Sequence, residues 1–178
     1  ILVYLCIITA VFSSFLDNVT TVLLMVPVTF SITKILRLDP MPYLLTQIVA
    51  SNIGGTATLI GDPPNIMIGS AVGLDFMDFV ANLTLISVLI FVLVQIILIF
   101  LYKKGMHTQP ELQEKIMRLP AGAQITDHTL LRKCLAVIAL TITLFVLHGS
   151  LGLESATVAL FGAGLLLLIT ATRDENMI

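Results

Sequence analysis

Asp17 is an acidic residue in the middle of a long apolar stretch. The residues on both sides of it, 1–16 and 19–33, include no charged side chain. An ionised carboxylate inside a membrane costs about 2.5 kcal/mol or more, so it needs water, a cation or a proton nearby. Asp17 is therefore a candidate ion-binding or proton-carrying residue. It is equally placed to cap a helix that starts two residues later, by accepting hydrogen bonds from the amides of Thr20 or Thr21. The two roles are compatible.

Asp62 lies in a second unusual segment, Ser51 to Ile68, which reads SNIGGTATLIGDPPNIMI. Its glycines loosen the backbone, and its two consecutive prolines lack the amide hydrogens that a continuous helix needs. The segment predicts two half helices, 43–52 and 66–73, joined by unwound backbone over 53–65. Unwound backbone persists at bilayer depth only where protein or a water-filled cavity surrounds it, so we expect this segment to line a binding site.

Oxygen atoms are the ligands that hard cations prefer, and both segments are rich in them. The alternatives are that the asparagines and threonines only satisfy the broken backbone, that Asp62 caps the second half helix, and that Gly54 and Gly55 pack closely against a neighbour. We expect a sodium ion near Asp17, Asn18 and Asp62, and no other cofactor. The candidate ion-binding or substrate-binding residues are Asp17, Asn18, Thr20, Asn52, Gly54, Gly55, Thr56, Thr58, Asp62 and Asn65.

The composition places the whole chain in a membrane. Of its 178 residues 57% are hydrophobic and 11% are charged, and the mean hydropathy is +1.05. Soluble domains carry roughly a quarter charged residues. The segment Leu83 to Tyr102 has no charge and is long enough to cross a hydrocarbon core of roughly 30 Å. Because the chain begins with Ile1 inside an apolar run, we expect it to be a fragment.

The apolar runs before and after Asp17 are each short of the roughly 20 residues that a spanning helix needs. Two such arms joined by a polar tip predict a re-entrant hairpin over residues 1–33, which enters and leaves on one side, with Asp17 and Asn18 near the midplane. One continuous helix with a buried acid is the alternative.

The remaining segments complete a polytopic pattern. The loop Leu74 to Asn82 separates the broken helix from the span 83–102, and two further spans are expected at 130–148 and 155–172, the first of them capped by Asp127. Pro110 to Leu119 predicts an interfacial amphipathic helix. These segments give four spans and one hairpin. The expected regions are 1–102 with the hairpin, broken helix and following span, 103–133 as a linker, and 134–178 with further spans.

All nine Lys and Arg residues fall on one side of this topology. Positively charged loops face the cytoplasm, so 34–42 and 103–133 are expected to be cytoplasmic in a bacterial plasma membrane. The rule requires the broken helix to cross the membrane once.

Motifs of soluble enzymes are absent from this sequence. It has no phosphate-binding GxxxxGK[ST], no GxSxG and no zinc-ligand spacing, and its three histidines form no metal-binding pattern. We therefore expect a protein that is not an enzyme. An intramembrane aspartyl enzyme that uses Asp17 and Asp62 is a remote alternative, and a membrane scaffold or channel subunit is a further one.

Two motifs also resemble a known family. FLDNVTTVLLMVPV at Phe15 to Val28 and SNIGGTATLIGDPPN at Ser51 to Asn65 closely resemble the ArsB/NhaD family of arsenite efflux permeases, sodium/proton antiporters and the melanosomal P protein, within the ion transporter superfamily. The resemblance implies an all-α polytopic membrane protein built from two inverted repeats, each with a re-entrant hairpin and a broken transmembrane helix. Only part of that architecture is present, with the second repeat opening near Leu130.

The hairpin tip narrows the implied function. Related sodium/dicarboxylate symporters carry Ser-Asn-Thr at this tip, whereas here only Asn18 matches, with Asp17 in place of Ser and Val19 in place of Thr. An acid repels a dianion and suits a proton or sodium. The expected function is secondary active transport of inorganic ions, by cation/proton antiport or proton-coupled efflux of the sodium or arsenite class; the alternative is a sodium-coupled citrate or dicarboxylate transporter. The expected partners are the lipid bilayer, the inorganic ion, the missing second repeat and a second copy in a homodimer, with no nucleic acid.

Overall fold

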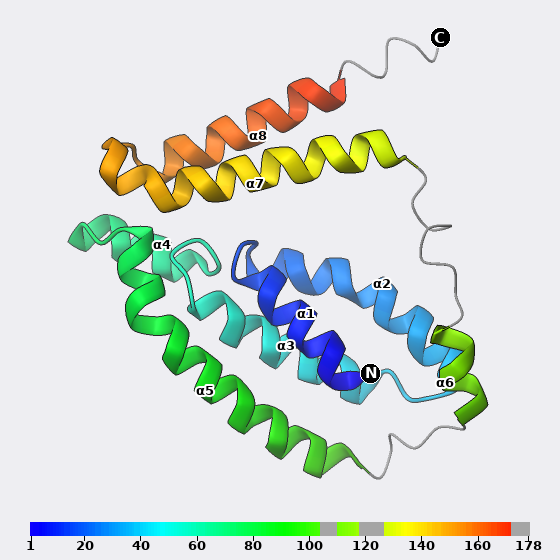
Figure 1. Ribbon diagram of the computed structural model, residues 1–178. Helices are drawn as coiled ribbons and strands as arrows, with labels where there is room; N and C mark the ends of the chain where they lie inside the picture. The colour runs from blue at the N-terminus through cyan, green and yellow to red at the C-terminus, as the bar shows by residue number, and fades with distance from the viewer. Residues whose placement is uncertain (104–109, 118–126, 172–178) are drawn as a thin grey trace. The chain divides into compact units, whose positions relative to one another are not determined.

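The computed structural model describes residues 1–103, 110–117 and 127–171, and within these ranges every regular element is an α-helix (Figure 1). The expected all-α class is therefore confirmed. The chain divides into two compact units, Ile1–Leu119 and Pro120–Ile178, and each is described by itself.

The first two helices form a hairpin. Helix α1 covers Leu2–Ser13 and helix α2 covers Asn18–Leu36, and the two lie side by side in opposite directions (Figure 1). Asp17 precedes α2 with extended backbone, φ −62° and ψ 153°, which interrupts the helical path. The alternative of one continuous helix is therefore wrong.

The broken helix is present, but its break is shorter than expected. Helix α3 runs over Met41–Thr56 and helix α4 over Pro63–Val72, so only residues 57–62 are non-helical. The predicted unwinding over 53–65 is wrong at both ends. Gly54 and Gly55 stay helical. The two prolines occupy the first positions of α4, where backbone amides have no partner within the helix, so the missing amide hydrogens of proline break no helical hydrogen bond.

Helix α5 begins earlier than the sequence suggested. It covers Phe76–Tyr102, so the expected loop over 74–82 shrinks to a turn at residues 73–75. The reason is a reciprocal cap. The Asp75 carboxylate accepts from the Asp78 amide, and the Asp78 carboxylate accepts from the Asp75 amide, each at 2.9 Å. Two acids that resemble a loop therefore form a capping box.

Three more helices follow. Helix α6 covers Pro110–Met117, α7 covers His128–Leu151, and α8 covers Ser155–Ala171. The predicted cap of α7 is confirmed, because the Asp127 carboxylate accepts from the amides of Thr129 and Leu130 at 2.8 and 2.9 Å. The expected ends at Leu119 and Thr172 lie outside the described residues.

Within the described residues, three helices are long and apolar enough to cross a membrane, namely α2, α5 and α7. The expectation that both hairpin arms are too short is therefore wrong for α2, which has 19 residues because it starts at Asn18 and continues to Leu36. Large apolar side chains remain exposed along α5, where Leu85, Leu93 and Ile97 are 68%, 61% and 63% accessible. Exposed apolar surface of this extent is typical of a helix that faces lipid.

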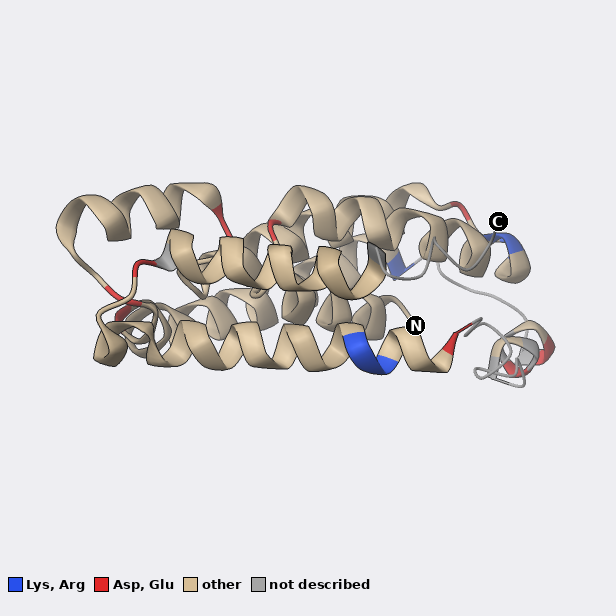
Figure 2. Cartoon of the chain, turned by 90° about the horizontal axis from the view of Figure 1, so that it is seen from above, with Lys and Arg blue, Asp and Glu red and all other residues tan. Residues whose placement is uncertain are grey.

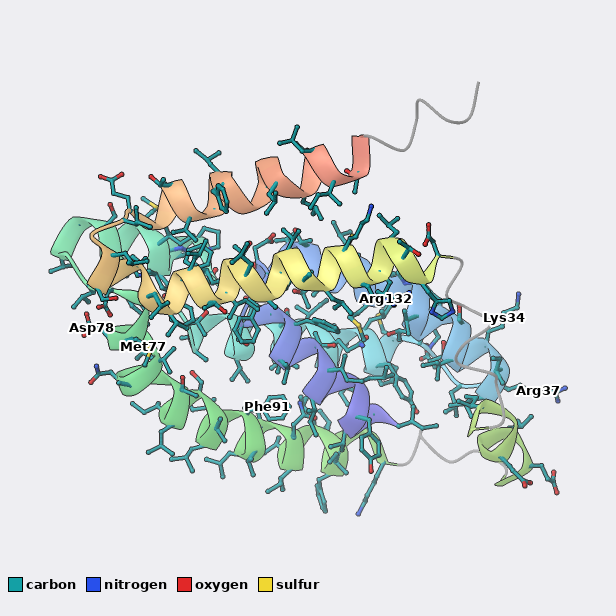
Figure 3. The ribbon with its side chains drawn as sticks, turned by 45° about the horizontal axis from the view of Figure 1, so that its top comes forward. Lys34, Arg37, Met77, Asp78, Phe91 and Arg132 are labelled. Carbon is teal, nitrogen blue, oxygen red and sulfur yellow. The ribbon has the colours of Figure 1, made fainter. Side chains whose placement is uncertain are left out.

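Unit 1 nevertheless has a core. Leu5 and Cys6 of α1, Met25 of α2, and Tyr43 of α3 are buried together. Phe91 projects from α5 against this cluster (Figure 3). The hairpin, α3 and α5 therefore form one packed body that can hold the predicted site.

Charged residues lie at or near helix ends (Figure 2). Lys34 and Arg37 lie at the end of α2, whereas Asp78 lies at the start of α5, at the opposite end of unit 1 (Figure 3). Unit 1 thus has a basic end and an acidic end, separated by the length of its helices.

Candidate functional site

The hairpin tip packs against the break between α3 and α4. The Ser13 hydroxyl donates to the carbonyl of Ser51 at 2.7 Å, and the Thr58 hydroxyl donates to the carbonyl of Ser14. Ser13 and Ser14 end α1, while Thr58 lies within the break. The two interruptions that the sequence singled out therefore meet in space.

Glycines make this approach close enough for hydrogen bonding. A Cβ atom at Gly54 would meet the backbone of Ala10, with the Ala10 Cα at 2.6 Å and its carbonyl oxygen nearer still. A Cβ at Gly55 would lie 2.5 Å from the carbonyl oxygen of Gly61. Gly54 and Gly55 are therefore close-packing residues in a helix, and the expectation that they open the backbone is wrong.

Asp17 caps α2 from the hairpin tip. Its Oδ1 accepts from the amides of Val19 and Thr20, both at 2.9 Å, and its Oδ2 accepts from the Thr20 hydroxyl. The capping interpretation is confirmed, with Val19 in place of Thr21 as the second donor. A carboxylate has about four lone-pair positions, so three bonds leave Asp17 with room for one further ligand.

Asn18 extends the same surface toward α3. Its side-chain nitrogen donates to Oδ1 of Asn52 at 3.0 Å, while Nδ2 of Asn52 donates to the carbonyl of Ile48 at 2.8 Å. The Asn18 Oδ1 has no hydrogen-bond partner within residues 1–103, so it is available as an oxygen ligand.

Asp62 precedes α4 but does not cap it. Its side chain accepts no hydrogen bond from the start of the helix, and no hydrogen bond to it occurs elsewhere in the described part of the chain. Pro63 and Pro64 have no N–H to donate, and the amide of Asn65, the next donor, bonds to the backbone carbonyl of Asp62 at 3.0 Å. The capping interpretation of this side chain is wrong, and Asp62 presents a half-buried carboxylate without a protein partner among the described residues.

Three of the predicted polar residues hold the break together. Nδ2 of Asn65 donates to the carbonyl of Thr58 at 2.8 Å and to that of Thr56 at 3.3 Å. The Thr58 hydroxyl also accepts from the amide of Gly61 at 3.2 Å, and the Thr56 hydroxyl donates to the Asn52 carbonyl at 2.8 Å. The Asn65 bonds satisfy carbonyls at and just beyond the end of α3, and the Thr58 hydroxyl satisfies the amide of Gly61 within the break.

The chemistry of this surface is that of oxygen ligands and two carboxylates. Within the described ranges, no group of three or more His, Cys, Asp or Glu side chains gathers as a transition-metal site would require. An apolar crevice of about 300 Å³ lies between α1, α3 and α5, and of the ten predicted residues only Gly54 lines it. The polar tip, and not this crevice, is therefore the candidate site.

Ser13, Ser14 and Ser51 were missed as contributors to the site. Ser13 and Ser14 lie immediately before the Asp17 interruption, and Ser51 immediately precedes Asn52. Small hydroxyl residues beside a predicted break are a signal that could have identified them, because unwound ends need donors for their carbonyls.

Comparison with known proteins identifies the family. The sequence model of the citrate transporter family, CitMHS, matches residues 1–177. The chain belongs to the citrate transporter family. An uncharacterized transporter of Mycobacterium tuberculosis is 40% identical to it over 178 residues, which is 99% of this chain and 41% of that protein. A 46 kDa membrane protein of Mycobacterium leprae is 41% identical over 170 residues, which is 96% of this chain and 40% of that protein.

A third relative connects this chain, a member of the citrate transporter family, to the wider ion transporter superfamily. The P protein of Homo sapiens is 49% identical over 87 residues, covering 46% of this chain and 10% of the P protein. The recognition made from the two motifs is confirmed. This chain spans about two fifths of the length of the mycobacterial relatives it matches.

Proposed function

We propose that the whole protein is a secondary active transporter of an inorganic ion of the sodium or arsenite class, working by cation/proton antiport or proton-coupled efflux. The observation that carries the proposal is the Asp62 carboxylate, which has no protein partner in residues 1–103 and belongs to the break against which the Asp17 hairpin tip packs. Neither 1–33 nor 38–102 contains Lys or Arg. Two acids without a basic partner favour a bound cation or proton.

The helix ends at the site also disfavour an anion. A helix N-terminus usually attracts anions through its free amides. Here the Val19 and Thr20 amides of α2 are already bonded to Asp17, and α4 starts with two prolines that have none to offer. A carboxylate substrate would meet two acids and few open amides. The Asn65 amide of α4 bonds to the Asp62 carbonyl, and at the start of α2 only the Asn18 amide has no hydrogen bond within the described residues.

Citrate or another dicarboxylate with a coupled sodium ion is the second candidate. The description of the family as citrate transporters favours it. In that case the cation would bind near Asp17, Asn18 and Asp62 and reduce the repulsion between these acids and the anion.

Half of the binding site belongs to unit 1, and we infer that a second repeat completes it. Thr20, Asn52 and Thr56 are exposed beside the tip, on a surface that is otherwise apolar. Polar side chains at bilayer depth need protein or water beside them. The hairpin and broken helix of the second repeat, which is expected to open near Leu130, would supply that cover and allow alternating access, in a bacterial plasma membrane with loops 34–42 and 103–133 cytoplasmic.

The aspartyl-enzyme alternative is less well supported. A catalytic acid pair shares a proton across a hydrogen bond. No hydrogen bond joins Asp17 to Asp62, whose side chains are both described.

The test is flux by the full-length protein in proteoliposomes. Sodium, lithium, arsenite and citrate are each supplied against an imposed pH gradient. We expect flux of sodium or lithium coupled to proton movement, and its loss in Asp62→Asn. This substitution removes the charge but breaks no hydrogen bond of the described residues. The matched control is Asp39→Asn. Asp39 lies in the basic loop, and its Oδ1 accepts a hydrogen bond from the Met41 amide at 3.0 Å.

Each result of this experiment decides between the candidate functions. Sodium or lithium flux that survives Asp39→Asn and is lost in Asp62→Asn supports the proposal. Arsenite efflux coupled to protons keeps the mechanism and changes the substrate. Citrate flux that depends on sodium selects the second candidate. Proton-independent flux, or full activity of Asp62→Asn, overturns the proposal.

A further inference from the structure

Gln47 of α3 is hydrogen-bonded to both arms of the hairpin. The Thr29 hydroxyl of α2 donates to Oε1 of Gln47 at 2.6 Å, and Nε2 of Gln47 donates to the Thr9 hydroxyl of α1 at 3.3 Å. The Thr9 hydroxyl in turn donates a hydrogen bond to the carbonyl of Leu5 at 2.7 Å. Thr9, Thr29 and Gln47 are each at most 2% accessible. One side chain therefore ties three helices together in the interior of unit 1.

This connection lies about one helical turn from the tip contacts. Ser51 and Asn52, which bond to Ser13 and Asn18 respectively, follow Gln47 by four and five residues on the same helix. A shift of the hairpin along α3 by one turn would break both bonds of Gln47 and both tip contacts. Among these α3 residues, Gln47 is the one whose single side chain bonds to both arms within the described residues.

Gln95 of α5 shows that burial alone does not create such a connection. It is 4% accessible, yet neither atom of its side-chain amide has a hydrogen-bond partner in the part of the chain that the structure describes. Gln47 and Gln95 thus form a matched pair of buried glutamines in apolar helices. Gln47 is hydrogen-bonded to both arms of the hairpin, whereas Gln95 lies beside the Cys6 thiol of α1 and holds neither arm by a hydrogen bond.

We propose that Gln47 is a positioning residue that sets the register of the hairpin along α3, and thereby the placement of the Asp17 carboxylate relative to Asp62. Its significance for transport rests on the proposed function, but the register itself can be measured without transport. Thr9, Thr29 and Gln47 are buried and distant in sequence from the acids, so they act through the hairpin and do not contact the ion.

Leucine at position 47 removes both bonds and keeps a side chain of similar volume, so the packing of the three helices is retained. Thr29 can then donate to a carbonyl of its own helix, as Thr33 does to the Thr29 carbonyl at 2.8 Å. The fold should therefore survive while the register loosens. Glutamate in its protonated form keeps one donor and one acceptor and is the conservative rescue variant.

The experiment is cross-linking in the full-length protein after its other cysteines are replaced. One cysteine pair, Asn18→Cys with Asn52→Cys, reports the native register. A second pair, Asn18→Cys with Ile48→Cys, reports a shift by one turn. A short bifunctional thiol reagent is applied to membranes, and the ratio of the two cross-linking rates is measured in each Gln47 background.

We expect Gln47→Leu to lower the ratio of native to shifted cross-linking by about eightfold, from about 2.8-fold for each of two interhelical hydrogen bonds. Thr29→Val removes one bond and should lower the ratio by about threefold. Gln47→Glu at acidic pH should restore most of the ratio, and the matched control Gln95→Leu should leave it unchanged.

Transport provides the second readout. With the native cysteines retained, Gln47→Leu should raise the KM for the transported cation more than it lowers the maximal rate, because the ligands are misplaced and not removed. If cross-linking shifts while the wild type carries no cation, the register role stands and the proposed function fails. An unchanged cross-linking ratio in Gln47→Leu, or an equal shift in Gln95→Leu, overturns the inference.

Discussion

The side-chain nitrogen of Asn18 lies 3.0 Å from the side-chain oxygen of Asn52 and joins the first turn of α2 to the last turns of α3. The direction of this bond follows from the neighbouring one, because Nδ2 of Asn52 is bonded to the Ile48 carbonyl and its Oδ1 must accept. The Asn18 Oδ1 is therefore left facing away from the bond. This contact joins the hairpin tip to the broken helix and leaves the Asn18 Oδ1 available as an oxygen ligand.

The first prediction concerns this pair. Asn18→Ala and Asn52→Ala should each destabilise the protein, and the double variant should destabilise it by about 0.6 kcal/mol less than their sum, the average for interhelical hydrogen bonds in membranes. The free energy of unfolding in detergent measures the difference. Asn82→Ala on the exposed start of α5 is the control partner, and it should be additive with Asn18→Ala. Full additivity of Asn18→Ala with Asn52→Ala would contradict the bond.

The second prediction separates the two roles of Asp17. Asparagine can still accept from the Val19 and Thr20 amides, so Asp17→Asn should keep the cap and the expression level. Alanine loses the cap and should cost about 1 kcal/mol of stability. Both variants should abolish coupled ion flux in the full-length protein because both remove the carboxylate. Ion-dependent flux of Asp17→Asn at the wild-type rate would leave Asp17 with a capping role alone.

The third prediction tests the close approach of α1 and α3. Gly54→Ala places a methyl group against the backbone of Ala10, which cannot move aside as a flexible side chain could. We expect a loss of about 1–3 kcal/mol in the free energy of unfolding, typical of overpacking. Gly164→Ala on α8 is the matched control, since nothing lies within 4 Å of its added Cβ, and it should be neutral or stabilising. Equal effects of the two substitutions would refute the contact.

The fourth prediction tests the hold of Asn65 on the break. Asp cannot donate a hydrogen bond when ionised, so Asn65→Asp leaves the carbonyls of Thr56 and Thr58 without their donor and places a negative charge beside them. A loss of at least about 2 kcal/mol is expected for this buried position. The control Asn82→Asp is exposed and should change stability by less than about 0.5 kcal/mol. Thermal unfolding of both variants in the same detergent gives the comparison.

Predictions from neighbouring residues were correct where hydrogen bonds between those neighbours decide the structure. The helix start at Asp127 and the interruption at Asp17 both follow from a carboxylate that accepts neighbouring amides. Such predictions were wrong where the same residues can form either a polar loop or a helix cap. Asp75 and Asp78 resemble a polar loop and form a capping box. Asp62 resembles a cap, but its side chain caps nothing, because the next two residues are prolines and the Asn65 amide bonds to the Asp62 backbone carbonyl.

Composition and residues adjacent in the chain were enough to predict the membrane class, the two interrupted segments and the transporter family. The packed helices were needed to show that Gly54 and Gly55 remain helical and lie against the backbones of Ala10 and Gly61, respectively. The packing also decided that Gln47 is hydrogen-bonded and Gln95 is not. Periodicity places both glutamines in apolar helices, but a hydrogen bond requires a partner from another helix at the right height, and that is fixed only when the helices pack.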